Sequence, residues 1–361
     1  MRHLLKIIDL FILKKFLSTF FFAIMILAVI ACVIDYSQKV DYFVEHHAPG
    51  GAIALYFLNF VPHITALLFP LFVFISTIFF TSKMAYKTEV IATLAAGVSF
   101  QRFLRPYVIG AVLLGMVSLF ANHWVVPIAN KYITDFHIKY IWPKKVGIDN
   151  NAHIRISPQM YVYMEGYNYN DGYGRKLTID KVGKQLLREK IVADRAYYDS
   201  TKKSWRLVKV WVRKNDGLKE TLTEVPEMTR KYPFAPSDFD DDNRNKEALT
   251  TPELMAYIAR EKARGKESVN YYAIELHRRS AQPFAGLILT IIGACIASRK
   301  VRGGSGFHLA MGIGLSALYM LFMQFAQTFS TNAGLNPLIA MWIPNIVFSM
   351  VALVLLRRQI K

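Results

Sequence analysis

Six long apolar runs constrain the fold of this chain more than any other feature. The first, residues 16–34, is unbroken and long enough for a helix to cross a bilayer. The other five are residues 53–80, 107–126, 271–298, 308–329 and 337–356. Because 53% of the 361 residues are hydrophobic, the composition also fits a membrane protein better than a soluble domain. The sequence therefore predicts six transmembrane helices in two groups of three.

The first run has a competing interpretation as a cleaved signal peptide. The segment VIAC at residues 29–32 is similar to a lipoprotein cleavage site, and Lys14 and Lys15 precede the run. The run is longer than the usual core of a signal peptide, however, and five further apolar runs follow it. These two features favour a retained first transmembrane helix.

Residues 128–269, between the two groups of apolar runs, have a different character. No run here is long and apolar enough to span a membrane. Short alternating runs start at residues 153, 160, 176, 190 and 204, and breaks rich in Asn, Asp, Gly and Lys separate them. This pattern predicts antiparallel strands in a β-sandwich-like domain.

The far boundary of this insert is an acidic linker at residues 238–242. Thr251 and Pro252 then begin a connecting helix, and Gly265 ends it. The predicted organisation has three parts: membrane helices in residues 1–127, a β domain with its connecting helix in residues 128–269, and membrane helices in residues 270–361.

A short polar segment, residues 84–97, separates the second and third apolar runs. At 100° per residue its apolar side chains fall on one helix face. The opposite face carries Glu89, Ala92, Thr93 and Ala96. Small side chains let a partner's backbone approach, and a carboxylate could pair with a basic group in a groove that receives a helix. The segment predicts a docking helix on the membrane surface; the alternative is an ordinary amphipathic loop helix with a solvated Glu89.

The distribution of the basic residues predicts how the chain is oriented. The net charge of +18 would suggest nucleic acid if it gathered on a soluble face. Of the 44 lysines and arginines, however, 17 lie outside residues 128–270, and 14 of these flank the side that holds both termini and residues 84–97. The positive-inside rule places that side in the cytoplasm. The β domain is then on the outer side, and nucleic-acid binding is not expected.

The chain lacks the motifs that catalysis needs. No G-x-x-x-x-G-K-[ST] is present to cradle a nucleotide phosphate, and the nine histidines show no H-x-x-x-H or Cys/His metal spacing. Cys32 and Cys295 both lie in apolar runs, where a cysteine acts as a small hydrophobe. We expect no catalytic site, no metal and no cofactor in this chain.

Four polar or basic residues of the membrane portion are the candidates for contact with a substrate. His63 follows Pro62 inside the second apolar run, where a polar side chain is costly unless it faces protein or water. Lys39, Arg278 and Arg279 lie at the outer face, where the positive-inside bias does not favour cations. Cations there suit an anionic headgroup, although anchoring to phospholipid, or for His63 a hydrogen bond to a neighbouring helix, is an equally simple account.

Several stretches together resemble the LptF/LptG permeases of the lipopolysaccharide export system, also called the YjgP/YjgQ family. They are the early IDLFILKKFL, the Val61-Pro62 pair with the later Pro70, the segment TEVIATLAAGVSFQRFLRP, the hairpin YYDSTKKSWRL and the closing PLIAMWIPN. The resemblance covers essentially the whole chain, and the order of the elements is more specific than any one motif. The chain departs from the family after the VP pair, where His63 replaces a residue that is often basic, and near the outer end of the first helix, which holds Asp35 and Lys39.

The resemblance implies a half-transporter rather than an enzyme. Such a subunit pairs with a paralogous permease, LptF or LptG, and sits on a cytoplasmic LptB-like ATPase dimer. Residues 84–97 would be the coupling helix, with Glu89 matching the family's coupling glutamate. The β domain would be the periplasmic jellyroll that passes lipopolysaccharide to an LptC/LptA-like bridge. These expectations place the chain in the inner membrane of a Gram-negative bacterium.

The function expected from these features is extraction of lipopolysaccharide from the inner membrane, driven by the separate ATPase through the Glu89 helix. The alternative is a scaffold permease that transmits ATPase motion to its outer domain without moving a substrate. Such a protein would need no basic groups facing a lipid-sized cavity. A secondary transporter is disfavoured, because His63 is the one ionisable candidate near the bilayer midplane.

Overall fold

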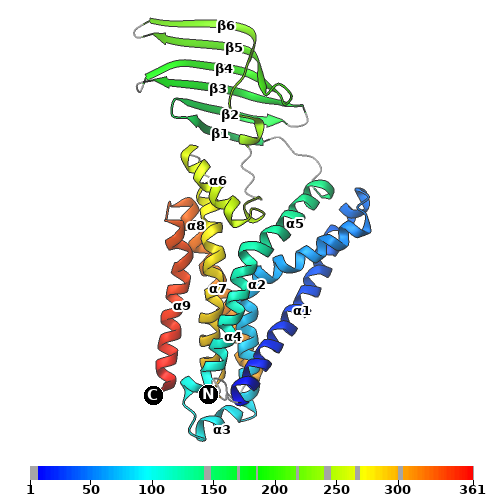
Figure 1. The fold of residues 1–361 in the computed structure, drawn as a ribbon, viewed down its shortest axis with the longest axis vertical. Helices are drawn as coiled ribbons and strands as arrows, with labels where there is room; N and C mark the ends of the chain where they lie inside the picture. The colour runs from blue at the N-terminus through cyan, green and yellow to red at the C-terminus, as the bar shows by residue number, and fades with distance from the viewer. Residues whose placement is uncertain are drawn as a thin grey trace. The chain divides into compact units, whose positions relative to one another are not determined.

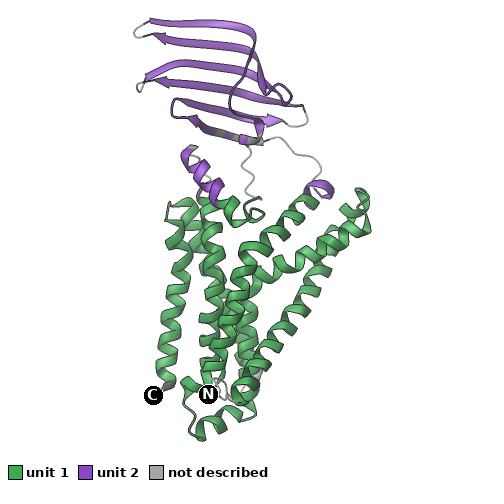
Figure 2. Cartoon of the chain, viewed as in Figure 1, with its two compact units in different colours: residues 1–136, 245–254, 270–361 green, residues 137–244, 255–269 purple. Residues whose placement is uncertain are grey.

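The computed structural model divides the chain into two compact units, shown in Figure 2. The membrane unit comprises residues 1–136, 245–254 and 270–361, and the β unit comprises residues 137–244 and 255–269. The structure describes residues 7–141, 148–168, 171–183, 186–216, 219–239, 245–264, 269–299 and 304–360.

The membrane unit is built from long helices. Their bounds are α1 Ile7–Glu45, α2 Gly50–Tyr86, α3 Glu89–Ala95, α4 Phe100–Phe120, α5 Val126–Tyr140, α7 Val269–Ala297, α8 Gly304–Asn332 and α9 Pro337–Ile360. Over the described part of the chain, six helices are long and apolar enough to cross a membrane, with α4 and α5 forming one of them. The prediction of six spans in two groups is therefore confirmed.

The spans differ in how much of them the protein itself covers. The most apolar window of α7 is 67% buried and that of α1 only 11%. Figure 1 shows α1 at the edge of the helices and α7 among them. Glycines allow close helix contacts: a Cβ at Gly110 would lie 2.7 Å from the Phe16 ring, and one at Gly286 would lie 2.8 Å from the Phe69 ring. Small residues at such positions are typical of membrane helix packing.

The third span continues beyond the expected end of the apolar run. A π-helical turn, Ala121–Val125, joins α4 to α5, and the helix runs through Pro127 to Tyr140. Proline lacks the N–H that would bond the carbonyl of His123. The Thr251 hydroxyl lies 3.4 Å from that carbonyl and donates to it, so the helix can pass the proline.

Two other helix prolines are compensated in the same way. Pro70 leaves the carbonyl of Ala66 without its helical donor, and the Gln282 amide donates to it at 2.5 Å. Pro283 leaves the carbonyl of Arg279 free, and the Asn122 amide lies 3.4 Å from it. Polar side chains thus take over bonds that proline removes, as a membrane interior requires.

The β unit contains a six-stranded antiparallel sheet. Its strands are β1 Ile148–Ser157, β2 Met160–Asn168, β3 Tyr173–Gly183, β4 Leu186–Asp199, β5 Ser204–Asp216 and β6 Lys219–Arg230, and each pairs with its sequence neighbours. Trp205 is fully buried in the core of this unit, and its ring N–H donates to the carbonyl of Phe234 at 2.9 Å. The prediction of a β-rich insert is confirmed. The described strands form a single sheet in simple up-and-down order.

Among the strands that the structure describes, β6 alone was not predicted from the alternating pattern. Its sequence, KETLTEVPEMTR, is polar and most of its residues are exposed. It pairs with β5 along one side and contains Pro226, which a strand tolerates only where the missing N–H would have faced outward. An exposed edge strand carries little of the hydrophobic alternation by which strands are found in a sequence.

Helix α6, Thr251–Arg264, begins one residue from where the sequence placed its cap. The backbone N–H and the hydroxyl of Thr250 both donate to Glu253, at 2.8 and 2.7 Å, so Thr250 rather than Thr251 is the cap. The hydrogen bonds from Thr250 hold the pKa of the Glu253 carboxyl below its usual value. Gly265, the expected end of this helix, lies outside the described residues.

Candidate functional site

Two adjacent arginines on α7, Arg278 and Arg279, line a charged cavity of the membrane unit. Arg278 and Arg279 both bond the same carboxylate, Glu275, which lies one turn earlier and has a side chain only 5% exposed. Positions three and four residues apart share one face of a helix, so the sequence places all three charges together. A buried carboxylate with two guanidiniums is stable because each charge has a hydrogen-bonded partner.

Arg279 serves the internal structure of the protein. It is 3% exposed, and its Nε donates to Glu275 at 2.9 Å. Its other nitrogens donate to the hydroxyl of Thr251 and to the backbone carbonyls of Lys246 and Glu247, at 3.3, 3.2 and 3.5 Å. The guanidinium therefore fixes residues 246–251 to α7.

Arg278 is more exposed than Arg279. Its Nε donates to Glu275 at 2.8 Å, and its Nη2 lies 2.8 Å from the same carboxylate and 3.6 Å from a carboxylate oxygen of Glu247. The side chain is 24% exposed and lines two cavities, one of about 230 Å³ and one of about 210 Å³. Of the two arginines, Arg278 is the one whose charge a ligand can reach.

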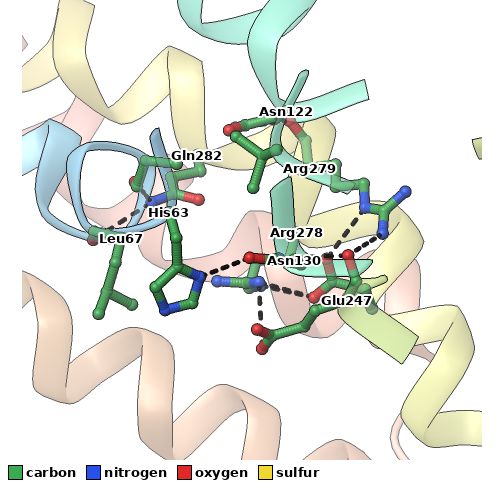
Figure 3. Close-up of a pocket in the computed structure, with 11 residues that line it drawn as sticks. His63, Leu67, Asn122, Asn130, Glu247, Arg278, Arg279 and Gln282 are labelled. Carbon is green, nitrogen blue, oxygen red and sulfur yellow. Dashed lines mark hydrogen bonds and ion pairs between the residues drawn. The ribbon is translucent and has the colours of Figure 1, made fainter. Parts of the chain in front are cut away.

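His63 and both arginines line the cavity of about 230 Å³, as Figure 3 shows. This cavity is called the charged cavity below. Its Nδ1 lies 2.7 Å from the side-chain oxygen of Asn130, and the Asn130 amide donates to the backbone carbonyl of Glu247 at 3.2 Å. The walls of this cavity thus include residues of α2, α5, α7 and the segment around Glu247. Three of the four predicted substrate contacts, His63, Arg278 and Arg279, meet here.

Lys39 lies elsewhere in the membrane unit. Its ammonium group donates to Asp35 at 2.6 Å and to the hydroxyl of Tyr56 at 2.7 Å, and that hydroxyl donates to the second Asp35 oxygen at 2.8 Å. It is not among the residues that line the charged cavity. The structure therefore separates Lys39 from the other three candidates and gives it a carboxylate partner.

The predicted docking segment is shorter as a helix than residues 84–97. Residues 84–86 belong to α2, Thr88 has a left-handed backbone with φ 62°, and α3 covers Glu89–Ala95. Val90 is fully buried and packs into the core of the membrane unit, whereas Ile91 is half exposed. Two apolar residues of the expected packing face, Ile91 and Ala95, are therefore exposed at the surface.

The opposite face of α3 is available to a partner. Ala92 and Ala96 are exposed and Glu89 is partly exposed, while the Thr93 hydroxyl bonds the Glu89 carbonyl at 2.7 Å. No ion pair is formed by the Glu89 carboxylate with any residue that the structure describes. A helix surface of small residues and one unpaired carboxylate is suited to contact with a basic groove.

One buried ion pair was not predicted from the sequence. Asp9 on α1 is 2% exposed and accepts a hydrogen bond at 2.5 Å from Arg102, in the first turn of α4. The two residues line a cavity of about 400 Å³ together with Thr93 of α3 and Gly97, which follows that helix. The sequence does contain one indication of this pair. Asp9 is a single carboxylate at the start of an apolar helix, and such a group requires a cationic partner.

The described residues contain no group of three or more His, Cys, Asp or Glu side chains that could hold a metal ion. The arrangement instead supports electrostatic binding of an anion at Arg278 and a protein contact at α3.

These features define a multi-pass membrane protein with a β-rich insert and a cationic cavity among its helices. The chain matches the family described as "Lipopolysaccharide export system permease LptF/LptG" over residues 10–358, nearly its whole length, and it belongs to that family. No curated protein matches the chain. Membership makes the chain a permease of lipopolysaccharide export and confirms the family resemblance.

Proposed function

We propose that this chain is a permease subunit that extracts lipopolysaccharide from the inner membrane, using ATP hydrolysed by a separate cytoplasmic subunit. The observation that carries the proposal is the cavity in which His63, Arg278 and Arg279 converge. A scaffold that moves no substrate has no use for a reachable cation such as Arg278. Lipopolysaccharide carries phosphate groups, and a guanidinium binds phosphate in a directional, charge-assisted way.

The positive-inside bias supports the sidedness of this proposal. It assigns both termini and α3 to the cytoplasm and the β unit to the periplasm. In that orientation α3 is the contact for an LptB-like ATPase dimer, with Glu89 as the charged group and Ala92, Thr93 and Ala96 as the close-approach surface. The β unit is then the domain that passes lipopolysaccharide to an LptC/LptA-like bridge, and a paralogous LptF or LptG subunit completes the transporter.

Among the substrate contacts, we assign the leading role to Arg278. Arg279 is occupied by four acceptors, and Lys39 is held by Asp35 and Tyr56. His63 adds a polar group to the cavity wall. Lys39 contributes to substrate binding only if an anion replaces Asp35.

Crosslinking of lipopolysaccharide in membranes tests the substrate part of the proposal. Replacing Arg278 with glutamine should reduce crosslinking from a photoreactive residue in the cavity wall by about tenfold, because a charge-assisted hydrogen bond is worth about 1.5–3 kcal/mol. Arg105→Gln is the matched control, since Arg105 is an exposed arginine at the end of the membrane unit where α4 begins. Equal crosslinking in both variants would exclude the cavity as the headgroup site.

Co-purification tests the coupling part separately. Glu89→Lys should abolish association with the ATPase while the chain still inserts into the membrane, because the reversed charge repels a basic groove. Glu45→Lys changes an exposed glutamate at the C-terminal end of α1, and it should leave association with the ATPase unchanged. If Glu89→Lys retains a stimulated ATPase, α3 is not the coupling element.

A further inference from the structure

The fixed charges around Arg278 and Arg279 already balance. Two guanidiniums face two carboxylates, Glu275 and Glu247, within 4 Å. An anion that enters this cavity therefore cannot simply add to a free cation. It must take the place of one carboxylate, because an excess negative charge in a low-dielectric site is costly.

The two carboxylates differ in how firmly they are held. Glu275 is 5% exposed and accepts hydrogen bonds from both arginines, at 2.8 and 2.9 Å. Glu247 has a side chain 36% exposed, and its oxygen lies 3.6 Å from Arg278, beyond hydrogen-bond distance. Glu247 is consequently the carboxylate that leaves at the lower cost.

The backbone around Glu247 stays in place when its side chain leaves. Its carbonyl accepts hydrogen bonds from Asn130 at 3.2 Å and from Arg279 at 3.5 Å, and the neighbouring Lys246 carbonyl accepts from Arg279 at 3.2 Å. The Glu247 carboxylate can thus swing out of the cavity and return to it without unfolding the segment that carries it.

We propose that Glu247 is a built-in competitor for the phosphate-binding cavity: its carboxylate pairs with Arg278 when the cavity is empty and is displaced by a phosphate group of the substrate. This inference rests on the proposed function. Because Arg278 and Arg279 otherwise share the single carboxylate of Glu275, the return of Glu247 keeps the charges of the cavity balanced after the substrate departs. It also weakens binding, so that a phosphorylated lipid is released rather than trapped.

Binding to the purified full-length chain in detergent tests the exchange. The probes are bisphosphorylated lipid A, the same lipid after removal of its phosphates, and inorganic phosphate alone. Glu247→Gln removes the competing charge and keeps the size of the side chain. It should tighten binding of the bisphosphorylated lipid by about threefold to fivefold, the range that a partly exposed ion pair supports. The dephosphorylated lipid should bind equally to both proteins.

Glu253→Gln is the matched control for this experiment. It removes one negative charge nearby in the sequence, but Glu253 lies in the first turn of α6 and bonds Thr250 rather than Arg278. It should leave all three affinities unchanged. Tightening of inorganic phosphate by Glu247→Gln would also support the exchange and would show that the phosphate group suffices without the lipid.

The outcomes separate this inference from the proposed function. If Arg278→Gln weakens binding of the bisphosphorylated lipid and Glu247→Gln changes nothing, the competitor role is wrong and the cavity remains the headgroup site. If Arg278→Gln changes nothing either, the cavity does not bind phosphate and both proposals fail. If Glu253→Gln tightened binding of the bisphosphorylated lipid as much as Glu247→Gln, the effect would come from the net charge of the chain rather than from Glu247. The competitor role would then be wrong.

Discussion

An ion pair of the membrane unit, Asp9 with Arg102, differs from one on the sheet of the β unit, Arg206 with Glu227, in burial and in what it connects. Asp9 and Arg102 join two helices across 93 residues, and the Asp9 side chain is 2% exposed. On the sheet, Arg206 and Glu227 join neighbouring strands, and both side chains are more than half exposed. The buried pair helps to determine how α1 and α4 meet. The exposed pair follows from the register of β5 and β6, which their backbone hydrogen bonds set.

The difference follows from the surroundings of the charges. Water solvates a charge on the sheet whether or not its partner is present, so an exposed pair contributes about 0.2–1 kcal/mol. Inside the membrane unit a carboxylate without its cation keeps the full cost of burial, and breaking such a pair costs about 3–5 kcal/mol. Removal of single charges, from the most buried pair to the most exposed, tests this comparison.

The largest effect is expected for Arg102→Gln. This change takes the guanidinium from a carboxylate that is 2% exposed. Because Arg102 itself is 28% exposed and solvent weakens the pair, the expected loss of stability is somewhat below that range, about 2–3 kcal/mol. Thermal unfolding of the full chain in detergent measures it. Lys14→Gln, at an exposed lysine of α1, serves as the control, and an equal effect of the two variants would remove the distinction between buried and exposed charges.

A second effect is expected to separate the two adjacent arginines of α7. Lysine keeps the charge of arginine but not its planar set of donors. Arg279→Lys should cost about 1–2 kcal/mol, because one ammonium group cannot reach Glu275, Thr251 and two carbonyls together. Arg278→Lys should change the unfolding temperature little, since its contacts are with two carboxylates. A larger loss for Arg278→Lys would reverse the assigned roles.

The comparison also explains which features the sequence could predict. The six spans and strands β1–β5 follow from runs of apolar or alternating residues, which are local properties of the chain. Strand β6 lacks that signal because it is an exposed edge. The sequence shows Asp9 and Arg102 as single charged residues but does not predict that they pair. Their pairing depends on how α1 meets α4.

The cavity shows the same limit. His63, Arg278 and Arg279 are exceptional in the sequence because they are polar residues in or beside apolar helices. Glu247 has no such signal, because a glutamate in a polar segment is ordinary. Its role depends on Arg279, which ties residues 246–251 to α7 through backbone carbonyls. Contacts of this kind between a side chain and a distant backbone leave no pattern along the chain.

A smaller effect, dependent on pH, is expected for Lys181→Gln in the β unit. Burial raises the pKa of Glu189, but the hydrogen bond and charge of Lys181, aided by Arg230, lower that pKa by more, so the net value is below the ordinary 4.5. Because the pKa of Glu189 is lower in the folded than in the unfolded protein, its ionised form stabilises the fold at pH values above the unfolded pKa. This stabilisation is lost as the pH falls through the pKa of the folded protein. Lys181→Gln should therefore cost about 1 kcal/mol at pH 7 and progressively less below pH 4.5.

Hydrogen exchange of the β4 amides in the full chain, followed between pH 7 and pH 3.5, measures this difference. Lys190→Gln is the control: Lys190 lies 3.8 Å from Asp180, and both side chains are at least one-third exposed. Its effect should be small at every pH. A cost of Lys181→Gln that stays constant down to pH 3.5 would show that Lys181 stabilises the sheet by packing rather than through the Glu189 charge.

The smallest effect is expected for Arg206→Gln. Its guanidinium lies 3.7 Å from Glu227 on the neighbouring strand and also 4.8 Å from the centre of the Tyr197 ring. Both contacts are at the surface, and glutamine keeps part of the packing against the tyrosine. The expected change in the free energy of unfolding is about 0.5 kcal/mol or less, and added salt should reduce it further because exposed charges are screened. If Arg206→Gln cost as much as Arg102→Gln, burial would not be what distinguishes these two ion pairs.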